Sequence, residues 1–202
     1  MGSVNRLDGP VCRRFIACKE QNMPFVCPWW GGYFIDNRVR KWLHPPEQIL
    51  EPYLRPSMTV LDFGCGMGFF SIAAAQLMGD SGRVVAVDLQ QQMLDVLRRR
   101  ADQAGVGDRI RTHRCEADAL LLDEPFDFAM AFYAAHEVPD QPRLLREIHR
   151  LLRPGAQFLL VEPVGHVRRH AFARTLDQAV EVGWEIVDRP AVRWSHAALL
   201  VR

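Results

Sequence analysis

A glycine-rich segment between an apolar run and a helical pattern constrains the fold of this chain more than any other feature. The run TVLDF at 59–63 predicts a buried strand, and Gly64, Gly66 and Gly68 follow it at alternate positions. Glycines allow a tight turn and a close approach of a ligand to the backbone. The helix predicted over 69–78 begins with backbone N–H groups that lack partners within the helix. The order strand, glycine turn, helix indicates either a ligand site or a purely structural turn of an α/β fold.

Strand and helix patterns alternate along the rest of the chain. Short, almost continuously apolar strands are typical of a parallel sheet covered by helices on both faces. Right-handed crossovers then give a doubly wound α/β fold, in which ligands bind at the carboxyl ends of the strands. We expect strands at 59–63, 83–88, 109–114, 126–133, 157–162, 185–188 and 193–201, and helices at 69–78, 90–104, 141–152 and 171–182.

The segment before the first strand has a different character. It contains the sequence CPWWGGY at 27–33, a helical pattern at 36–43 and an amphipathic piece at 47–54. The length of 202 residues fits one domain plus an extension. We therefore divide the chain into an N-terminal extension and cap over the ligand cleft, residues 1–56, and an α/β domain, residues 57–202.

Charge and composition argue against several classes of protein. Lys and Arg number 25 and Asp and Glu 24, so the net charge of +1 supplies no field that would attract nucleic acid. No apolar run reaches the roughly 20 residues that span a bilayer. The N-terminus has no charged start followed by an apolar stretch, so we expect a cytoplasmic protein.

The five cysteines do not indicate a disulfide framework or a zinc site. Cys65 and Cys115 fall inside predicted core elements. The spacings of Cys12, Cys18 and Cys27 match none of the paired zinc patterns. We interpret these three as incidental thiols and expect no metal; a metal or arsenic site is the alternative.

Two carboxylates indicate which ligand the glycine turn binds. Asp88 ends the second strand, 20 residues after Gly68, where nucleotide-binding sheets place an acid on the ribose hydroxyls. Position 69 is Phe69, so the glycine pattern of pyrophosphate-binding turns is incomplete. Asp62, just before the turn, would repel a pyrophosphate and attract an ammonium group. These features favour S-adenosylmethionine over nicotinamide or flavin dinucleotides.

Four ordered motifs make residues 57–202 similar to class I S-adenosylmethionine-dependent methyltransferases. Residues 60–68 resemble the first motif of this family, and AVDL at 86–89 resembles the second. EADA at 116–119 resembles the third motif, and LLRPGA at 151–156 resembles the turn before the fifth strand, with Ala156 where the family has glycine. The resemblance implies a seven-stranded, mostly parallel sheet with strand order 3-2-1-4-5-7-6 and an antiparallel seventh strand.

The same resemblance implies a set of cofactor contacts. Asp88 is the implied ribose acid, and the segment 116–119 would meet the adenine. The complete implied set is Asp62, Gly64, Cys65, Gly66, Gly68, Phe69, Asp88, Leu89, Met93, Glu116, Ala117, Asp118, Ala119 and Phe132. Within the family, the chain most resembles the small-molecule branch that includes the ubiquinone/menaquinone-type (methyltransferase type 11-like) enzymes.

Candidate substrate residues follow the fourth and fifth strands. His136 is a candidate general base with Glu137 orienting it, or either residue positions the substrate, or His136 only holds the loop. Tyr133 lines the methyl site or belongs to the core. Glu162 and His166 would form the other wall of this cleft, and the aromatic residues of the extension would either cover it as a lid or pack on the sheet: Trp29, Trp30 and Tyr33.

The leading hypothesis is therefore a methyltransferase that acts on a small molecule. No sizeable insertion for a substrate domain interrupts the α/β pattern. A nucleic-acid methyltransferase is one alternative, but residues 132–135 read FYAA where amino-methylating DNA enzymes carry a Pro-Pro motif. A non-catalytic subunit that binds S-adenosylmethionine and supports a partner is another. We expect a small-molecule substrate, no nucleic acid and no membrane span, and the pattern allows a homodimer.

Overall fold

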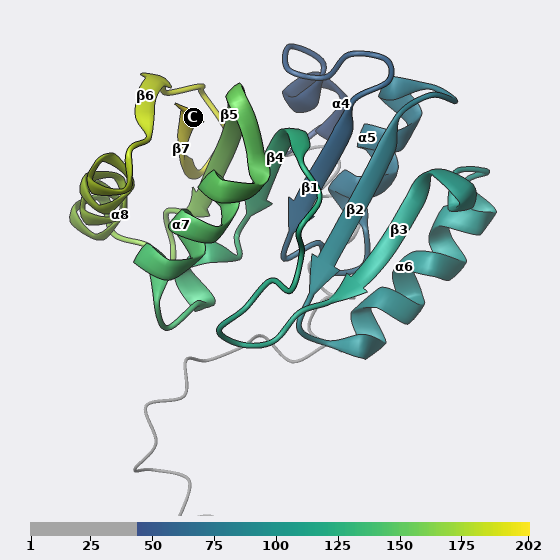
Figure 1. The fold of residues 1–202 in the computed structure, drawn as a ribbon, viewed down its shortest axis with the longest axis horizontal. Helices are drawn as coiled ribbons and strands as arrows, with labels where there is room; N and C mark the ends of the chain where they lie inside the picture. Colours follow the sequence, from purple (N-terminus) through teal and green to yellow (C-terminus); the bar gives the residue numbers. More distant parts are fainter. Residues whose placement is uncertain (1–43) are drawn as a thin grey trace, which may run out of the picture.

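The computed structural model describes residues 44–202, which form a seven-stranded sheet with helices on both faces (Figure 1). The strand order is β3-β2-β1-β4-β5-β7-β6, which confirms the order implied by the family resemblance. The strands are β1 (Thr59–Phe63), β2 (Arg83–Asp88), β3 (Ile110–Arg114), β4 (Phe126–Phe132), β5 (Leu152–Pro163), β6 (Glu185–Asp188) and β7 (Ser195–Val201). The helices are α4 (Pro46–Leu50), α5 (Phe69–Met78), α6 (Gln91–Gln103), α7 (Gln141–Leu151) and α8 (Arg169–Val182), with short 3-10 turns η2 (Gly107–Arg109) and η3 (Ala135–Glu137).

The sheet is parallel from β3 to β5, and β7 runs antiparallel to both β5 and β6. The strand order reverses between β1 and β4, which pair through Val60 with Phe128 and Phe63 with Ala131. In doubly wound sheets this reversal opens a crevice at the carboxyl ends of the strands, where ligands bind. The candidate site residues therefore gather at one edge of the sheet.

Two apolar layers bury the two faces of the sheet. Alternate residues of β1 separate, with Val60 in the layer beneath α4, α5 and α6, and Leu61 in the layer beneath α7 and α8. This follows from the period of two in a strand. Wholly buried Phe126, Phe128 and Phe158 lie near the centre of the molecule. Apolar strands flanked by helices thus produce the sandwich that the sequence predicts.

Helix ends follow local chemical signals. Asp140 caps α7, because its Oδ1 accepts from the backbone N–H of Arg143 at 2.9 Å, and Pro142 lies in the first turn. Gly183 ends α8 in a left-handed conformation with φ of 112°. Four strands differ from the predictions at one end or both. β4 ends at Phe132 and β7 begins at Ser195, since Tyr133 and Trp194 have positive φ values that interrupt the strands. β5 is longer than the predicted 157–162, and β3 begins one residue later than predicted.

The part of the predicted extension that the structure describes packs on the sheet. Helix α4 is shorter than the amphipathic pattern at 47–54, since Pro52 cannot continue the helix. Leu50 and Leu54 are buried in the same layer as α5, and Tyr53 stacks on Phe128 with ring centroids 5.8 Å apart. The boundary at residue 56 stays a prediction. Other predictions fall outside the described residues: the helical pattern at 36–43 and the positions Cys12, Cys18, Cys27, Trp29, Trp30 and Tyr33.

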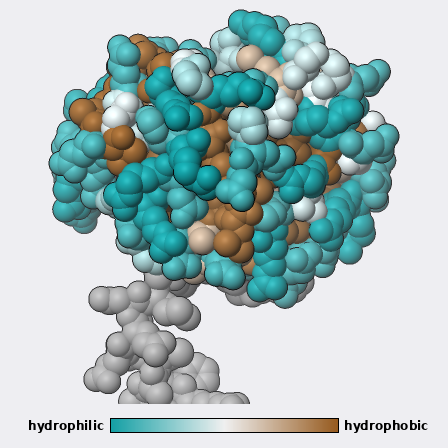
Figure 2. Space-filling model, in the orientation of Figure 1, coloured by the Kyte–Doolittle hydropathy of each residue, from teal (hydrophilic) through white to brown (hydrophobic). Residues whose placement is uncertain are grey.

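No helix within residues 44–202 is long and apolar enough to cross a membrane. The face of the molecule shown in Figure 2 is mainly hydrophilic, and apolar atoms show between the polar side chains. The large apolar side chains that are exposed in the described region are few: Leu121, Val164, Val180, Val187 and Trp194.

Candidate functional site

The glycine turn closes tightly over the ends of β1 and β2. The backbone N–H groups of Gly64 and Cys65 both donate to the carbonyl oxygen of Val87, at 2.8 and 3.0 Å. Gly64 has a φ of 69°, and a Cβ built on it would lie 2.1 Å from the Cβ of Ala134. Only glycine fits there, so the turn and the segment after β4 lie in direct contact.

Gly66 occupies the open side of the same turn. Its φ is 52°, and a Cβ built on it would meet no atom within 4 Å. Its N–H donates to Oδ2 of Asp88 at 2.9 Å, and Oδ1 of Asp88 accepts from the N–H of Gln90 at 2.8 Å. Open space above an exposed backbone beside a fixed carboxylate is suited to a ligand that carries hydroxyl donors.

The Asp88 carboxyl is nearly enclosed, with 9% of the residue exposed. Burial raises its pKa, and hydrogen bonds from the Gln90, Gly66 and Leu89 amides counteract part of that rise. These amides hold the carboxyl at the carboxyl end of β2. The sequence pattern predicts the ribose acid at this position.

Asp62 is buried below the turn, with 2% of the residue exposed. Its Oδ2 accepts a hydrogen bond of 2.5 Å from the hydroxyl of Ser71, one turn into α5. No Lys or Arg occurs between Leu61 and Ile72. Arg100 of α6 donates to the carbonyl oxygen of Met67 in this turn at 3.4 Å, so the turn has one cation near the two buried carboxylates Asp62 and Asp88.

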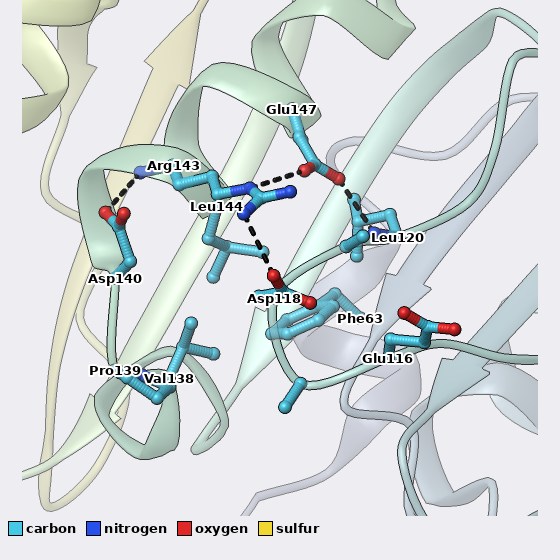
Figure 3. A pocket seen from close by; sticks show the side chains of 12 residues that line it. Phe63, Glu116, Asp118, Leu120, Val138, Pro139, Asp140, Arg143, Leu144 and Glu147 are labelled. Carbon is cyan, nitrogen blue, oxygen red and sulfur yellow. Dashed lines mark hydrogen bonds and ion pairs between the residues drawn. The ribbon is translucent and has the colours of Figure 1, made fainter.

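A cavity of about 60 Å³ opens beside the turn, between the segment after β3 and the start of α7 (Figure 3). Its apolar lining comes from Phe63, Ala117, Ala119, Leu120, Val138, Pro139 and Leu144, and its polar rim from Glu116, Asp118, Asp140, Arg143 and Glu147. Residues 116–119 thus lie on a concave surface next to β1, as the sequence analysis predicts for an adenine contact.

Two side chains of α7 hold the rim of this cavity together. Arg143 bonds Asp118 at 3.1 Å and Glu147 at 3.3 Å, and Glu147 also accepts from the backbone N–H of Leu120 at 2.7 Å (Figure 3). The Asp118 and Arg143 side chains are about half exposed. Such an ion pair is weak, so Asp118 can exchange Arg143 for a ligand at little cost.

Four of the predicted cofactor residues pack against side chains of the protein core. Phe132 stacks on Phe70 with centroids 3.6 Å apart, and Met93 lies in a small cluster with Met67 and Val96. Contact of Phe132 or Met93 with the cofactor stays a prediction. Two others, Leu89 and Phe69, are partly buried beside the core.

The two described cysteines are inert thiols beside Asp88. Burial and the nearby Asp88 carboxylate raise the pKa of Cys65 well above its usual value. The same two causes raise the pKa of Cys115 to about 11. Both thiols therefore remain protonated at neutral pH and are poor nucleophiles. Among residues 44–202 no group of His, Cys, Asp and Glu side chains is arranged to hold a metal ion.

His136, Glu162 and His166 come together at the carboxyl ends of β4 and β5. Nδ1 of His136 lies 2.6 Å from Oε2 of Glu162, and the His136 backbone N–H donates to Oε1 at 3.0 Å. The ring of His166 lies 6.0 Å from that of His136. The sequence analysis offers Glu137 as the orienting acid; the structure corrects this, because Glu162 is the carboxylate bonded to the ring.

Tyr133 belongs to a separate polar group on the other face of the sheet. Its φ is 60°, and its hydroxyl lies 2.6 Å from Oγ of Ser195 and 2.9 Å from Nε2 of His44. Nε2 of His44 also lies 2.8 Å from the carbonyl oxygen of Arg193. The Tyr133 ring packs with the α4–α5 layer, whereas Glu162 lies on the same face of β5 as Phe158 and Leu160, which belong to the opposite layer.

The sequence patterns did not reveal five of the residues that build the region at the carboxyl ends of the strands. His44 and Ser195 are 89 and 62 positions from Tyr133, so no local pattern joins them. Ser71 has no signal beyond its place in a predicted helix. Arg143 and Glu147 are a pair four residues apart on α7 and follow a recognisable helix cap, so that signal was available.

Comparison with known proteins finds similarity to one domain family and to one fold. A family model described as a methyltransferase domain matches residues 60–155. The chain is 33% identical over 117 residues to a demethylmenaquinone methyltransferase of Symbiobacterium thermophilum, covering 57% of this chain and 47% of that protein. It is 36% identical over 110 residues to a ubiquinone/menaquinone biosynthesis C-methyltransferase of Hahella chejuensis, covering 54% of this chain and 44% of the relative. Thus the chain spans about half the length of these relatives.

A solved structure extends the similarity beyond the matched segment. The crystal structure of an S-adenosylmethionine-dependent methyltransferase from Aquifex aeolicus superposes with a TM-score of 0.79 and 21% identity. The superposition covers 88% of this chain and 100% of that structure. At this identity the likeness concerns the fold, which matches the doubly wound architecture described above.

Proposed function

We propose that this chain, which carries a class I S-adenosylmethionine-dependent methyltransferase domain, transfers a methyl group from S-adenosylmethionine to a small molecule. The observation that supports the proposal most is the pairing of Gly66 with Asp88. This pairing leaves open space above the backbone of Gly66, beside the Asp88 carboxylate at the end of β2. The family match over residues 60–155 and the names of the relatives point to the same chemistry.

The residues at the strand ends fit the proposed cofactor. A carboxylate has about four lone-pair sites, so Asp88 accepts three amides and keeps a site for a ribose hydroxyl. Asp62 adds negative charge below the turn, which favours the ammonium and sulfonium groups. The N-terminal end of α5, which is the positive end of the helix dipole, suits the carboxylate of the amino acid. The cavity edged by Ala117 and Val138 lies beside these groups, on the side where the adenine would extend.

Bound S-adenosylmethionine supplies a methyl carbon that its sulfonium has already activated toward nucleophiles. The protein's task is then mainly to align the acceptor with this carbon and to exclude water. The contact of Gly64 with Ala134 joins the cofactor turn to the segment after β4. His136 lies on that segment and faces Glu162 of β5. We assign this side of the cleft to the acceptor.

A small acceptor is favoured by what surrounds the site. The connection between β3 and β4, residues 115–125, folds onto α7 through Glu147 and Arg150 and adds no separate substrate domain. The net charge of +1 gives no general attraction for phosphate backbones. The relatives named for menaquinone and ubiquinone biosynthesis act on small molecules, which supports the same class here. A cytoplasmic location and a homodimer stay predictions.

One experiment separates the proposed function from its alternatives. The chain is incubated with methyl-labelled S-adenosylmethionine and with either the small-molecule fraction or the RNA and DNA of a bacterial extract. Label in a small organic product, with release of S-adenosylhomocysteine, is the expected result. Label in nucleic acid would contradict the proposal. So would cofactor binding without transfer to any fraction, which would favour a non-catalytic subunit.

A further inference from the structure

We propose that His136 is the general base of the reaction and Glu162 its positioning residue, so that the methyl acceptor is an atom that carries a proton. This inference rests on the proposed function and adds the chemical class of the substrate, a compound that loses a proton from a hydroxyl, an N–H or a hydroxyl-activated C–H group. It excludes acceptors such as tertiary amines and thioethers, which have no proton to lose at the reacting atom.

The first support is the place of His136 in the sheet. The residue lies in η3, between Ala134, which contacts the glycine turn, and Val138, which lines the cavity beside it. β4 pairs with β1 at the point where the strand order reverses. Ligands of doubly wound sheets bind at this point. His136 is therefore within the crevice region.

The second support is the way Glu162 holds the histidine. One carboxylate oxygen accepts from the His136 backbone N–H at 3.0 Å, and the other meets Nδ1 at 2.6 Å. Glu162 is 3% exposed and is fixed in β5, where it pairs with His196 of β7. A carboxylate only accepts hydrogen bonds, so Nδ1 carries the proton. Nε2 then has the lone pair that a base needs.

Two carboxylates act on the charge of this ring, and one further histidine lies beside it. They are Glu162 on β5, Glu137 on η3 and His166 after β5. Burial is the largest single influence and lowers the pKa of His136, but the hydrogen bond and charge of Glu162 together with the charge of Glu137 outweigh it, so the pKa is raised. Neutral His136 is thus a stronger base than free histidine, and it becomes available only as the pH rises through the raised pKa.

The proposed step conserves atoms and electrons. The acceptor's proton moves to Nε2 of His136, and the electron pair that it leaves forms the new bond to the methyl carbon. The bond between that carbon and sulfur breaks, and its electron pair stays on the sulfur. The positive charge that was on the sulfur ends on the imidazolium, which the buried Glu162 carboxylate stabilises. Bulk solvent then removes the proton from His136, whose side chain is 21% exposed.

The first test measures the imidazole directly. The pKa of His136 is followed by NMR, with S-adenosylhomocysteine bound, in the wild-type chain, in Glu162→Gln and in Glu181→Gln, which removes an exposed carboxylate of α8. We expect a wild-type value above 6.5 that falls clearly in Glu162→Gln and is unchanged in Glu181→Gln. Equal values in all three proteins would overturn the pairing.

The second test uses acceptors of known chemistry. Release of S-adenosylhomocysteine is measured with a panel of phenols, alcohols and primary amines, and with tertiary amines and thioethers. We expect turnover only with acceptors that carry a proton, with kcat/KM rising through the pKa of His136. His136→Gln should lower kcat/KM by about 10²–10⁴-fold and abolish that pH dependence. Methylation of a thioether, no methylation of any phenol, alcohol or amine, or an unchanged pH profile in His136→Gln would overturn the proposal.

Calorimetric measurement of S-adenosylhomocysteine binding distinguishes a failure of this inference from a failure of the proposed function. If His136→Gln binds S-adenosylhomocysteine as tightly as wild type, a lost rate is due to the base and not to a lost fold or cofactor site. Should His136→Gln fail to fold, His136→Asn carries the same test. If wild type binds no S-adenosylhomocysteine, the proposed function itself fails.

Discussion

Gly66 and Gly155 share a left-handed backbone conformation but lie in different surroundings. Both have positive φ, 52° and 78°, and a Cβ on either would meet no atom within 4 Å. Gly66 faces the proposed cofactor, whereas Gly155 lies in the first part of β5, at the opposite end of the strand from Glu162. The two positions therefore separate the cost of strain from the cost of lost ligand contact.

Alanine at either glycine should lower the free energy of unfolding by about 1–2 kcal/mol, because an L-residue resists the left-handed conformation. Only Gly66→Ala should also weaken binding of S-adenosylhomocysteine, by roughly tenfold, which corresponds to about 1.4 kcal/mol. Chemical denaturation and calorimetry on both variants check this. Equal affinity in the two variants would remove Gly66 from the site.

The pairing of His136 with Glu162 should also appear in the pH dependence of stability. Because the folded-state pKa of His136 is raised, the pair stabilises the fold fully below the unfolded pKa of about 6.5, and this stabilisation is lost as the pH rises through the folded pKa. Urea titrations between pH 5.5 and 8.5 should show a fall that is smaller in Glu162→Gln. A parallel profile in the variant would count against the pair.

Helix α4 shows how a segment before the first strand becomes part of the core. Leu50 is completely buried against α5 and the sheet, while Ile49 on the same helix is only partly buried. The amphipathic pattern at 47–54 predicts a helix, but its place on the sheet face depends on contacts with Phe70 and Phe128 that are distant in sequence.

We expect Leu50→Ala to lower the free energy of unfolding by about 2–5 kcal/mol, the usual cost of a cavity in a packed core. Ile49→Ala is the matched control and should cost less. Denaturant unfolding of both variants measures the difference. A loss in Leu50→Ala no larger than in Ile49→Ala would mean that α4 is only loosely attached.

Most elements were predictable because their ends have local chemical signals. Gly79, Gly105 and Gly183 follow the ends of α5, α6 and α8, and β2 and β4 are almost continuously apolar. The β5 boundary was less predictable. The chain passes from α7 at Leu151 directly into β5 at Leu152, with no loop to mark the change. The pairing of β5 with β4 determines where β5 begins, and that pairing cannot be read from a single sequence.

At the scale of the whole molecule, the sheet topology brings together residues whose contact no sequence pattern predicts. The motif around Gly66 and Asp88 is local enough to predict, since it follows two consecutive strands. The partner of His136 is 26 positions away on β5, and sheet order, not spacing, selects Glu162 over the adjacent Glu137. The cofactor side of the crevice is thus readable from sequence, whereas the acceptor side depends on the folded sheet.

Calorimetric titration of the chain with S-adenosylhomocysteine, and separately with NAD, tests the central claim most directly. We predict saturable binding of S-adenosylhomocysteine and no comparable heat with NAD. Asp88→Ala should bind it at least tenfold more weakly, because each hydrogen bond to a charged group contributes about 1.5–3 kcal/mol. Asp80→Ala, at an exposed aspartate before β2, should bind as wild type does. No binding of S-adenosylhomocysteine, tight binding of NAD, or an undiminished affinity in Asp88→Ala would contradict the account.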